Sequence, residues 1–171
     1  MSELQRFTTE YVDVEDRIRL SGEIAPGEAQ ILWLTRRLIG RLLPHLCEWL
    51  EKLHGAGNRQ TDASMTNVMQ GFALQAALQA LVPQAPVRSE KVQCSWLVQA
   101  VDISGGNEAA LRLAFRGREG ERVMLTLPPQ ALRQWLGILH SQCSVGGWPL
   151  EAPPWLAELA SGGAQSPTSL H

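Results

Sequence analysis

The sequence predicts an α+β fold built as a tandem pseudo-repeat, in which each copy is a β-hairpin followed by a helix. Residues 18–46 align without a gap with residues 111–139, at a fixed offset of 93. Both stretches read as strand, turn, strand and helix, and a repeated supersecondary unit constrains a fold more strongly than any single propensity. We therefore expect an antiparallel sheet of five to six strands, with two amphipathic helices on one face and a third connecting helix.

The length of 171 residues is enough to bury one hydrophobic core. We expect one α+β domain over residues 1–160, with pseudo-repeat units at 5–57 and 90–147 and a connecting helix at 61–82. Residues 161–171 are rich in Ser, Gly, Gln and Pro, a composition typical of a disordered tail.

The first unit begins with a predicted strand over residues 7–14 and continues with a clear hairpin. Ile18 and Leu20 alternate with polar residues, as a half-buried strand requires. Pro26 and Gly27 then fit a type II turn, because proline fixes one φ and glycine accepts a positive one. Residues 29–35 form the returning strand.

Thr35 is placed to cap the first helix, since its hydroxyl can accept an otherwise unpaired backbone N–H. Apolar residues at 39, 42, 43, 46, 49, 50 and 53 make one buried stripe. Pro44 lies inside this pattern and predicts a kink.

The connecting segment has an unusual composition, because residues 63–87 contain no charged side chain. Helical spacing is nevertheless kept by a series of apolar residues: Met65, Val68, Met69, Phe72, Ala76 and Leu81. A helix on the surface of a soluble protein normally shows charges on its outer face. Two interpretations follow: a helix whose polar face is merely uncharged, or a helix covered by the fold on one face and by a second chain on the other.

The second unit starts with one long predicted strand over residues 91–103. A hairpin at 111–127 follows, turning at Gly117 to Gly120, and Pro128 and Pro129 stand where a helix tolerates a missing N–H. The helix buries a stripe made of Leu132, Trp135, Leu136, Leu139 and Cys143. Beyond it, Trp148 and Trp155 lie in a proline-rich extension that either straps back over the core or faces a partner.

Composition favours a cytoplasmic protein. The formal net charge of −2 argues against indiscriminate nucleic-acid binding, and three cysteines without paired spacing suit a reducing compartment. The N-terminal residues do not resemble a signal peptide, and no apolar run reaches the length of a membrane span.

The motifs of common enzymes are missing from the sequence. It contains no GxSxG, P-loop, dinucleotide fingerprint, HExxH or CxxC pattern. Four potential zinc ligands fall on the two unit helices, but without metal-binding spacing: His45, Cys47, His140 and Cys143. We therefore expect no enzyme, no metal and no cofactor.

The remaining signals favour a non-enzymatic binding or assembly protein, an adaptor or chaperone for a protein partner that forms a homodimer. The predicted partner-binding residues are Trp33, Phe72, Met124, Trp148 and Trp155.

The alternative is single-stranded nucleic-acid binding, because arginines beside an aromatic on a sheet can follow a phosphate backbone and stack on bases. The residues of that face are Arg17, Arg19, Arg112, Arg116 and Arg122. Two sheet-plus-helix units in tandem are also similar in outline to the Whirly type of single-strand-binding fold, and this resemblance of topology implies the same activity. Ordinary outward arginines paired with glutamates would produce the same pattern.

Overall fold

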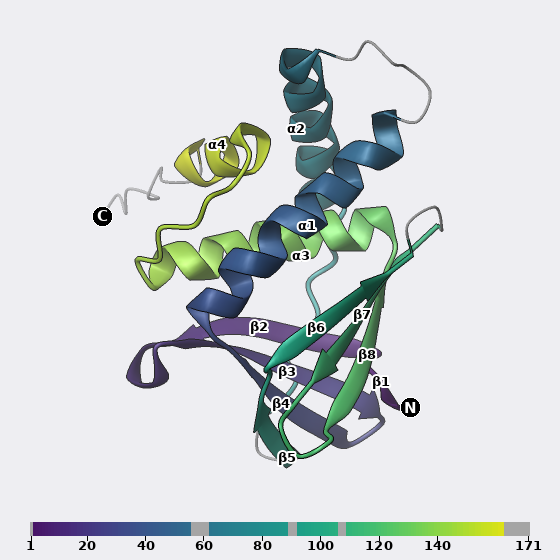
Figure 1. Ribbon diagram of the computed structural model, residues 1–171, viewed down its shortest axis with the longest axis vertical. Helices are drawn as coiled ribbons and strands as arrows, with labels where there is room; N and C mark the ends of the chain where they lie inside the picture. The colour runs from purple at the N-terminus through teal and green to yellow at the C-terminus, as the bar shows by residue number, and fades with distance from the viewer. Residues whose placement is uncertain (1, 56–61, 89–91, 106–108, 163–171) are drawn as a thin grey trace, which may run out of the picture.

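The computed structural model describes residues 2–55, 62–88, 92–105 and 109–162, which form an α+β fold with two four-stranded sheets (Figure 1). The strands are β1 (Ser2–Glu3), β2 (Arg6–Val12), β3 (Arg17–Ala25), β4 (Glu28–Leu34), β5 (Val92–Leu97), β6 (Ala100–Ser104), β7 (Leu111–Arg116) and β8 (Arg122–Leu127). The helices are α1 (Arg36–Gly55), α2 (Ala63–Gln79), α3 (Pro129–Val145), α4 (Pro154–Gly162) and a short 3-10 helix, η1 (Asp13–Glu15).

The expectation of a single antiparallel sheet of five to six strands is wrong. One sheet has the order β1-β8-β7-β6 and the other the order β2-β3-β4-β5. Each is mixed, because β1 pairs in parallel with β8 and β4 pairs in parallel with β5. Each parallel pair joins the first strand of one half of the chain to the last strand of the other half. The local alternation of apolar residues does not reveal such long-range pairing.

The chain passes from one sheet to the other at two corners. At the first, the Leu4 N–H donates to Met124 of the β1–β8 sheet, while the Gln5 N–H donates to Glu23 of β3. At the second, the Val98 N–H donates to Trp33 of β4, and the Gln99 N–H donates to Arg116 of β7. The strand expected over residues 91–103 is therefore two strands that belong to different sheets.

The two hairpins keep the same register at an offset of 93. Ile18 lies opposite Leu34 in the β3–β4 pair, and Leu111 lies opposite Leu127 in the β7–β8 pair. The side chains of these leucines and of Ile18 are buried, as the alternation predicts. Gly27 and Gly120 close the two turns at φ values of 83° and 90°, a region where glycine avoids the clash of a Cβ atom.

Helices α1 and α3 cross on the same side of the strands, above them in Figure 1. Thr35 caps α1 as predicted, with Oγ1 accepting a 3.2 Å hydrogen bond from the Leu38 N–H. Pro44 lies inside α1, and the leucines that flank it, Leu43 and Leu46, are completely buried. The core thus forms between the leucines of the sheets and the apolar stripes of these two helices.

Helices α2 and α4 form an outer layer beyond α1 and α3 (Figure 1). The connecting helix spans Ala63–Gln79 rather than residues 61–82. Helix α4 lies within the proline-rich extension, and only its end reaches the predicted tail, whose residues 163–171 lie outside the described part of the chain. Among the described helices, none combines the length and apolar character that crossing a membrane requires.

Candidate functional site

The outward side of α2 carries an apolar stripe formed by Met65, Val68, Met69 and Phe72. These residues stand at positions i, i+3, i+4 and i+7, the spacing of one face of a helix. Their exposed fractions are 59%, 53%, 43% and 69% in that order. Large apolar side chains gathered on one exposed helical face are typical of a surface that contacts another molecule.

The opposite side of α2 is fixed to the fold. Gln70, Leu74 and Ala77 are buried there. The Gln70 Nε2 donates to the carbonyl oxygen of Leu50 in α1 at 3.1 Å, and the Gln134 Nε2 of α3 donates to the carbonyl oxygen of Ala77 at 2.9 Å. These contacts hold the helix in one orientation, so the stripe is presented as a defined surface.

Two further features set the position of α2. Asp62 caps its first turn, with Oδ1 accepting a hydrogen bond from the Ser64 N–H. Near its last turn, Leu78 packs against Gly137 of α3, where an added Cβ would lie 2.9 Å from a Leu78 methyl carbon. The absence of a side chain at Gly137 therefore allows the two helices to approach closely.

The predicted partner-binding residues do not form one surface. Phe72 is in the α2 stripe, whereas Trp33 and Met124 are half-buried in separate sheets. Trp148 and Trp155 are buried in the chain's own core, where their indole N–H groups donate to carboxylate oxygens of Asp16 and Glu51, both at 2.9 Å. This placement matches the strap interpretation and removes both tryptophans from the exposed surface.

The predicted partner-binding residues do not include Met65, Val68 and Met69, although these three share the helical spacing of Phe72. The signal that identifies them is the lack of charge over residues 63–87, combined with two apolar faces on one helix. Burial on one face only could not be read from the sequence, because both faces of α2 carry apolar residues.

The arginines of the nucleic-acid alternative are largely engaged with carboxylates. Arg19 bonds with Glu10, and Arg17 lies 3.9 Å from Glu15. Arg116 makes a two-pronged contact with Asp102, with both N–O distances at 2.8 Å. Arg17 and Arg19 also belong to a different sheet from Arg112, Arg116 and Arg122. This arrangement agrees with ordinary outward arginines paired with acids, and nucleic-acid binding stays an untested prediction.

The potential zinc ligands are not arranged for metal binding. Burial raises the pKa of Cys47 and of Cys143 to about 12, so both thiols keep their protons at neutral pH. Burial also lowers the pKa of His140. Within the described residues, no group of three or more His, Cys, Asp or Glu side chains could hold a metal ion.

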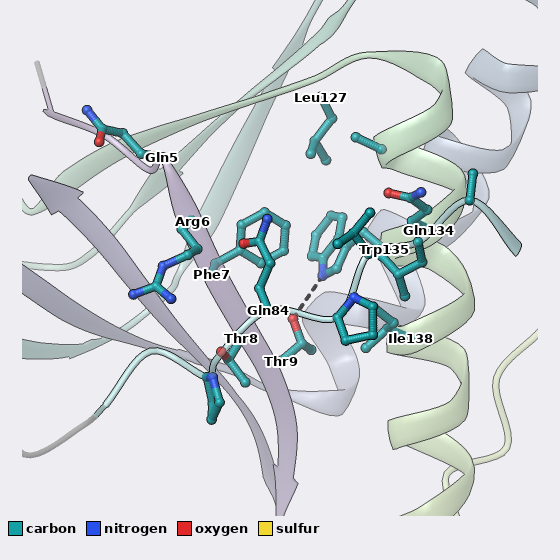
Figure 2. Close-up of a pocket in the computed structure, with 16 residues that line it drawn as sticks. Gln5, Arg6, Phe7, Thr8, Thr9, Gln84, Leu127, Gln134, Trp135 and Ile138 are labelled. Atoms are coloured by element: carbon teal, nitrogen blue, oxygen red, sulfur yellow. Dashed lines mark hydrogen bonds between the residues drawn. The ribbon is translucent and has the colours of Figure 1, made fainter. Parts of the chain in front are cut away.

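A cavity of about 600 Å³ lies between β2, α3 and the segment of residues 80–86 (Figure 2). The rings of Phe7 and Trp135 line it in an edge-to-face contact, with centroids 6.0 Å apart. The Trp135 indole N–H donates to Thr9 Oγ1 at 3.1 Å, which fixes the indole against β2.

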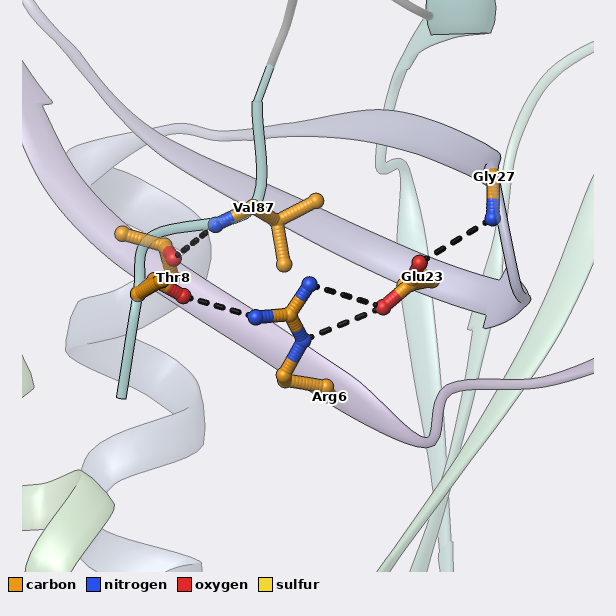
Figure 3. Close-up of polar contacts among 6 residues, drawn as sticks. Arg6, Thr8, Glu23, Gly27 and Val87 are labelled. Atoms are coloured by element: carbon orange, nitrogen blue, oxygen red, sulfur yellow. Dashed lines mark hydrogen bonds and ion pairs between the residues drawn. The ribbon is translucent and has the colours of Figure 1, made fainter. Parts of the chain in front are cut away.

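The segment of residues 80–88 leads from α2 toward β5 and is tied to β2 by side chains (Figure 3). The Val87 N–H donates to Thr8 Oγ1 at 2.9 Å, and Arg6 Nη1 donates to the carbonyl oxygen of Ala85 at 2.8 Å. Arg6 also pairs with Glu23 at 2.9 Å, and Glu23 in turn accepts from the Gly27 N–H. The hydrogen bond from the Gly27 N–H and, after it, the contact with Arg6 lower the pKa of Glu23.

Comparison with protein-family models, with curated proteins and with solved structures finds no match for this chain.

Proposed function

We propose that this chain is a non-enzymatic binding or assembly protein that forms a homodimer through the α2 stripe. The observation that carries the proposal is the exposure of Met65, Val68, Met69 and Phe72 on a helix whose other face is held by the fold. Burying this stripe against a second copy would remove apolar surface from water, at roughly 25 cal/mol per Å².

The chemistry of α2 suits a contact between identical chains. A two-fold interface places the same patch on both subunits, so any charge near the axis meets its own copy. The α2 stripe lies in a stretch without charged residues, and two copies can therefore approach without like-charge repulsion. The helix is also about 25 Å long, at 1.5 Å per residue, so an antiparallel pair has room for all four side chains of each stripe.

Sedimentation equilibrium tests the proposal at about 5 to 100 µM, the range in which dimers of moderate affinity assemble. We expect the wild-type chain to sediment as a dimer and the double variant Met69→Glu/Phe72→Glu as a folded monomer. Ala63→Glu is the matched control, because it adds a carboxylate to an exposed position of the same helix on the side away from the stripe. A wild-type chain that stays monomeric throughout this range would contradict the proposal, as would a double variant that dimerises like the control.

Within this proposal the dimer acts as an adaptor or chaperone for another protein. The support is apolar surface beyond the stripe: Leu81 and Val82 follow α2 directly and are 39% and 72% exposed. A contact between two α2 helices leaves this second region free for a different partner.

We also infer that the fold arose as a duplicated unit of four strands and one helix, with the first strand of each unit exchanged. The first unit contains β1 to β4 and α1, and the second contains β5 to β8 and α3. In each sheet the first strand of one unit pairs in parallel with the last strand of the other, and both hairpins share their register. This correspondence between the two units supports the proposed duplication.

A further inference from the structure

Strand β2 stands at the edge of its sheet, so one of its two sides faces no other strand within the part of the chain that the structure describes. Antiparallel pairing uses the backbone groups of alternate residues. The Tyr11 N–H donates to Gln142 Oε1 of α3 at 2.9 Å instead of to β3. By this alternation, the backbone N–H and C=O groups of Phe7 and Thr9 also point away from β3.

The outer edge of β2 is closed at one end and opens onto a cavity at the other, where Phe7 is half-buried and Thr9 is 9% exposed. Gln142 covers the Tyr11 N–H, and Gly146 of the same segment approaches the Tyr11 ring so closely that an added Cβ would lie 2.6 Å from it. Phe7 and Thr9 instead border the cavity between β2 and α3. Among the hydrogen bonds of the described residues, none uses the outward backbone groups of Phe7 or Thr9.

The walls of the cavity suit an uncharged, partly apolar chain. Leu81, Ile138 and the two aromatic rings supply apolar surface. Three side-chain amides that both donate and accept hydrogen bonds also line it, from Gln5, Gln84 and Gln134. Arg6 is the one charged side chain among the described lining residues, and its charge is matched by Glu23.

We propose that this open edge binds an extended, uncharged peptide segment of a partner protein, which adds to β2 as a further strand. Free backbone groups at a sheet edge select an extended backbone, and an adjoining pocket selects alternate side chains. The cavity volume of about 600 Å³ lies within the range of established binding sites. This inference rests on the proposed protein-binding function and names the class of partner, at a site separate from the α2 stripe.

The first test uses a defined probe, a pentapeptide of alternating threonine and valine with acetylated and amidated ends. Titration into the 15N-labelled full chain should slow the hydrogen exchange of the Phe7 and Thr9 amides, because each becomes hydrogen-bonded to the added strand. The control is the same peptide N-methylated at every residue, which keeps its side chains but loses the N–H of each residue and retains only those of the terminal amide. We expect its affinity to fall about tenfold or more, since each lost hydrogen bond contributes a factor of about 3 to 10.

A matched pair of variants tests the protein side of the same contact. Thr9→Ala and Thr9→Pro both lose the hydrogen bond to Trp135, but only the proline variant also loses the Thr9 N–H. We expect Thr9→Pro to bind the peptide about 3 to 10 times more weakly than Thr9→Ala. Circular dichroism checks that both variants fold. If either variant fails to fold, binding of the N-methylated peptide to the wild-type chain tests the backbone pairing instead.

Equal binding of the N-methylated peptide, or unchanged exchange at Phe7 and Thr9 at saturating peptide, would overturn the strand proposal. Chemical-shift changes at Leu81 and Ile138 without protection of Phe7 and Thr9 would also overturn it, because the peptide would then occupy the cavity without pairing with β2. Sedimentation separates this outcome from the fate of the dimer, because peptide binding at β2 does not require the α2 stripe. A monomeric chain that binds the peptide would support the β2 strand site and contradict the proposed dimer.

Discussion

Arg133 of α3 donates a 3.3 Å hydrogen bond from Nη2 to Oε1 of Gln70 in α2, and both side chains are buried. The other end of the Gln70 amide donates to the carbonyl oxygen of Leu50 in α1. One glutamine therefore links three helices through directional contacts. Because buried polar groups are costly unless they are hydrogen-bonded, this link fixes the orientation of α2 and with it the α2 stripe.

Replacing Gln70 by leucine should destabilise the fold by about 1 to 3 kcal/mol, since the substitution removes two buried hydrogen bonds from groups that stay in the interior. Urea denaturation monitored by tryptophan fluorescence measures this change. Gln75→Leu is the matched control, because Gln75 lies on the exposed part of the same helix. Equal free energies of unfolding for the two variants would show that the link does not stabilise the packing of α2.

Leu43 of α1 and Leu136 of α3 stand 93 positions apart, and both are completely buried. Truncation of either to alanine should cost about 2 to 5 kcal/mol, from lost burial and from the cavity left behind. Thermal unfolding checks both variants against Leu81→Ala, which alters a residue that is 39% exposed. If the midpoint of either core variant matches that of Leu81→Ala, the corresponding helix does not belong to the core.

The three cysteines should differ sharply in reactivity. Cys94 is exposed on β5, whereas burial of Cys47 and Cys143 raises their pKa values to about 12 and suppresses the reactive thiolate. Ellman's reagent at pH 8 should therefore modify one thiol in the native chain and three after denaturation. The Cys94→Ser variant should show no rapid phase, and rapid labelling of two thiols in the native wild type would contradict the burial of the helix cysteines.

Asp16 should make part of the stability dependent on pH. Its carboxylate accepts hydrogen bonds from the Trp148 indole and the Tyr11 hydroxyl, and these contacts lower its pKa in the folded chain. A lowered folded pKa means that the ionised form stabilises the fold above the ordinary value of about 3.9, and this contribution disappears as the pH falls through the folded value. The thermal midpoint of wild type should exceed that of Asp16→Asn at pH 7, and the gap should narrow as the pH falls below the ordinary value of about 3.9. A gap of constant size from pH 7 to pH 2.5 would count against this role.

The helical stripe of α2 could be recognised from the sequence, but its exposure could not. Met65 and Phe72 have helical spacing, and Leu74 and Ala77 have it equally well on the opposite face. The choice of the buried face depends on Gln70, Gln134 and Gly137, whose partners lie on other helices. The cavity beside β2 depends in the same way on Trp135 of α3, 126 positions from its hydrogen-bond partner Thr9.

Local pattern determined the hairpins and the unit helices of this protein, because the alternation of Ile18 with Leu20, the glycine turns and the leucine stripes act over a few neighbouring residues. The tertiary structure alone decided that these elements form two sheets. The parallel pairing of Ser2 with Val123 and of Ile31 with Ser95 joins residues that are far apart in the chain, and it depends on backbone groups that every residue carries. Such pairing leaves no residue signature, so only the folded arrangement reveals where each strand goes and which edge of β2 stays open.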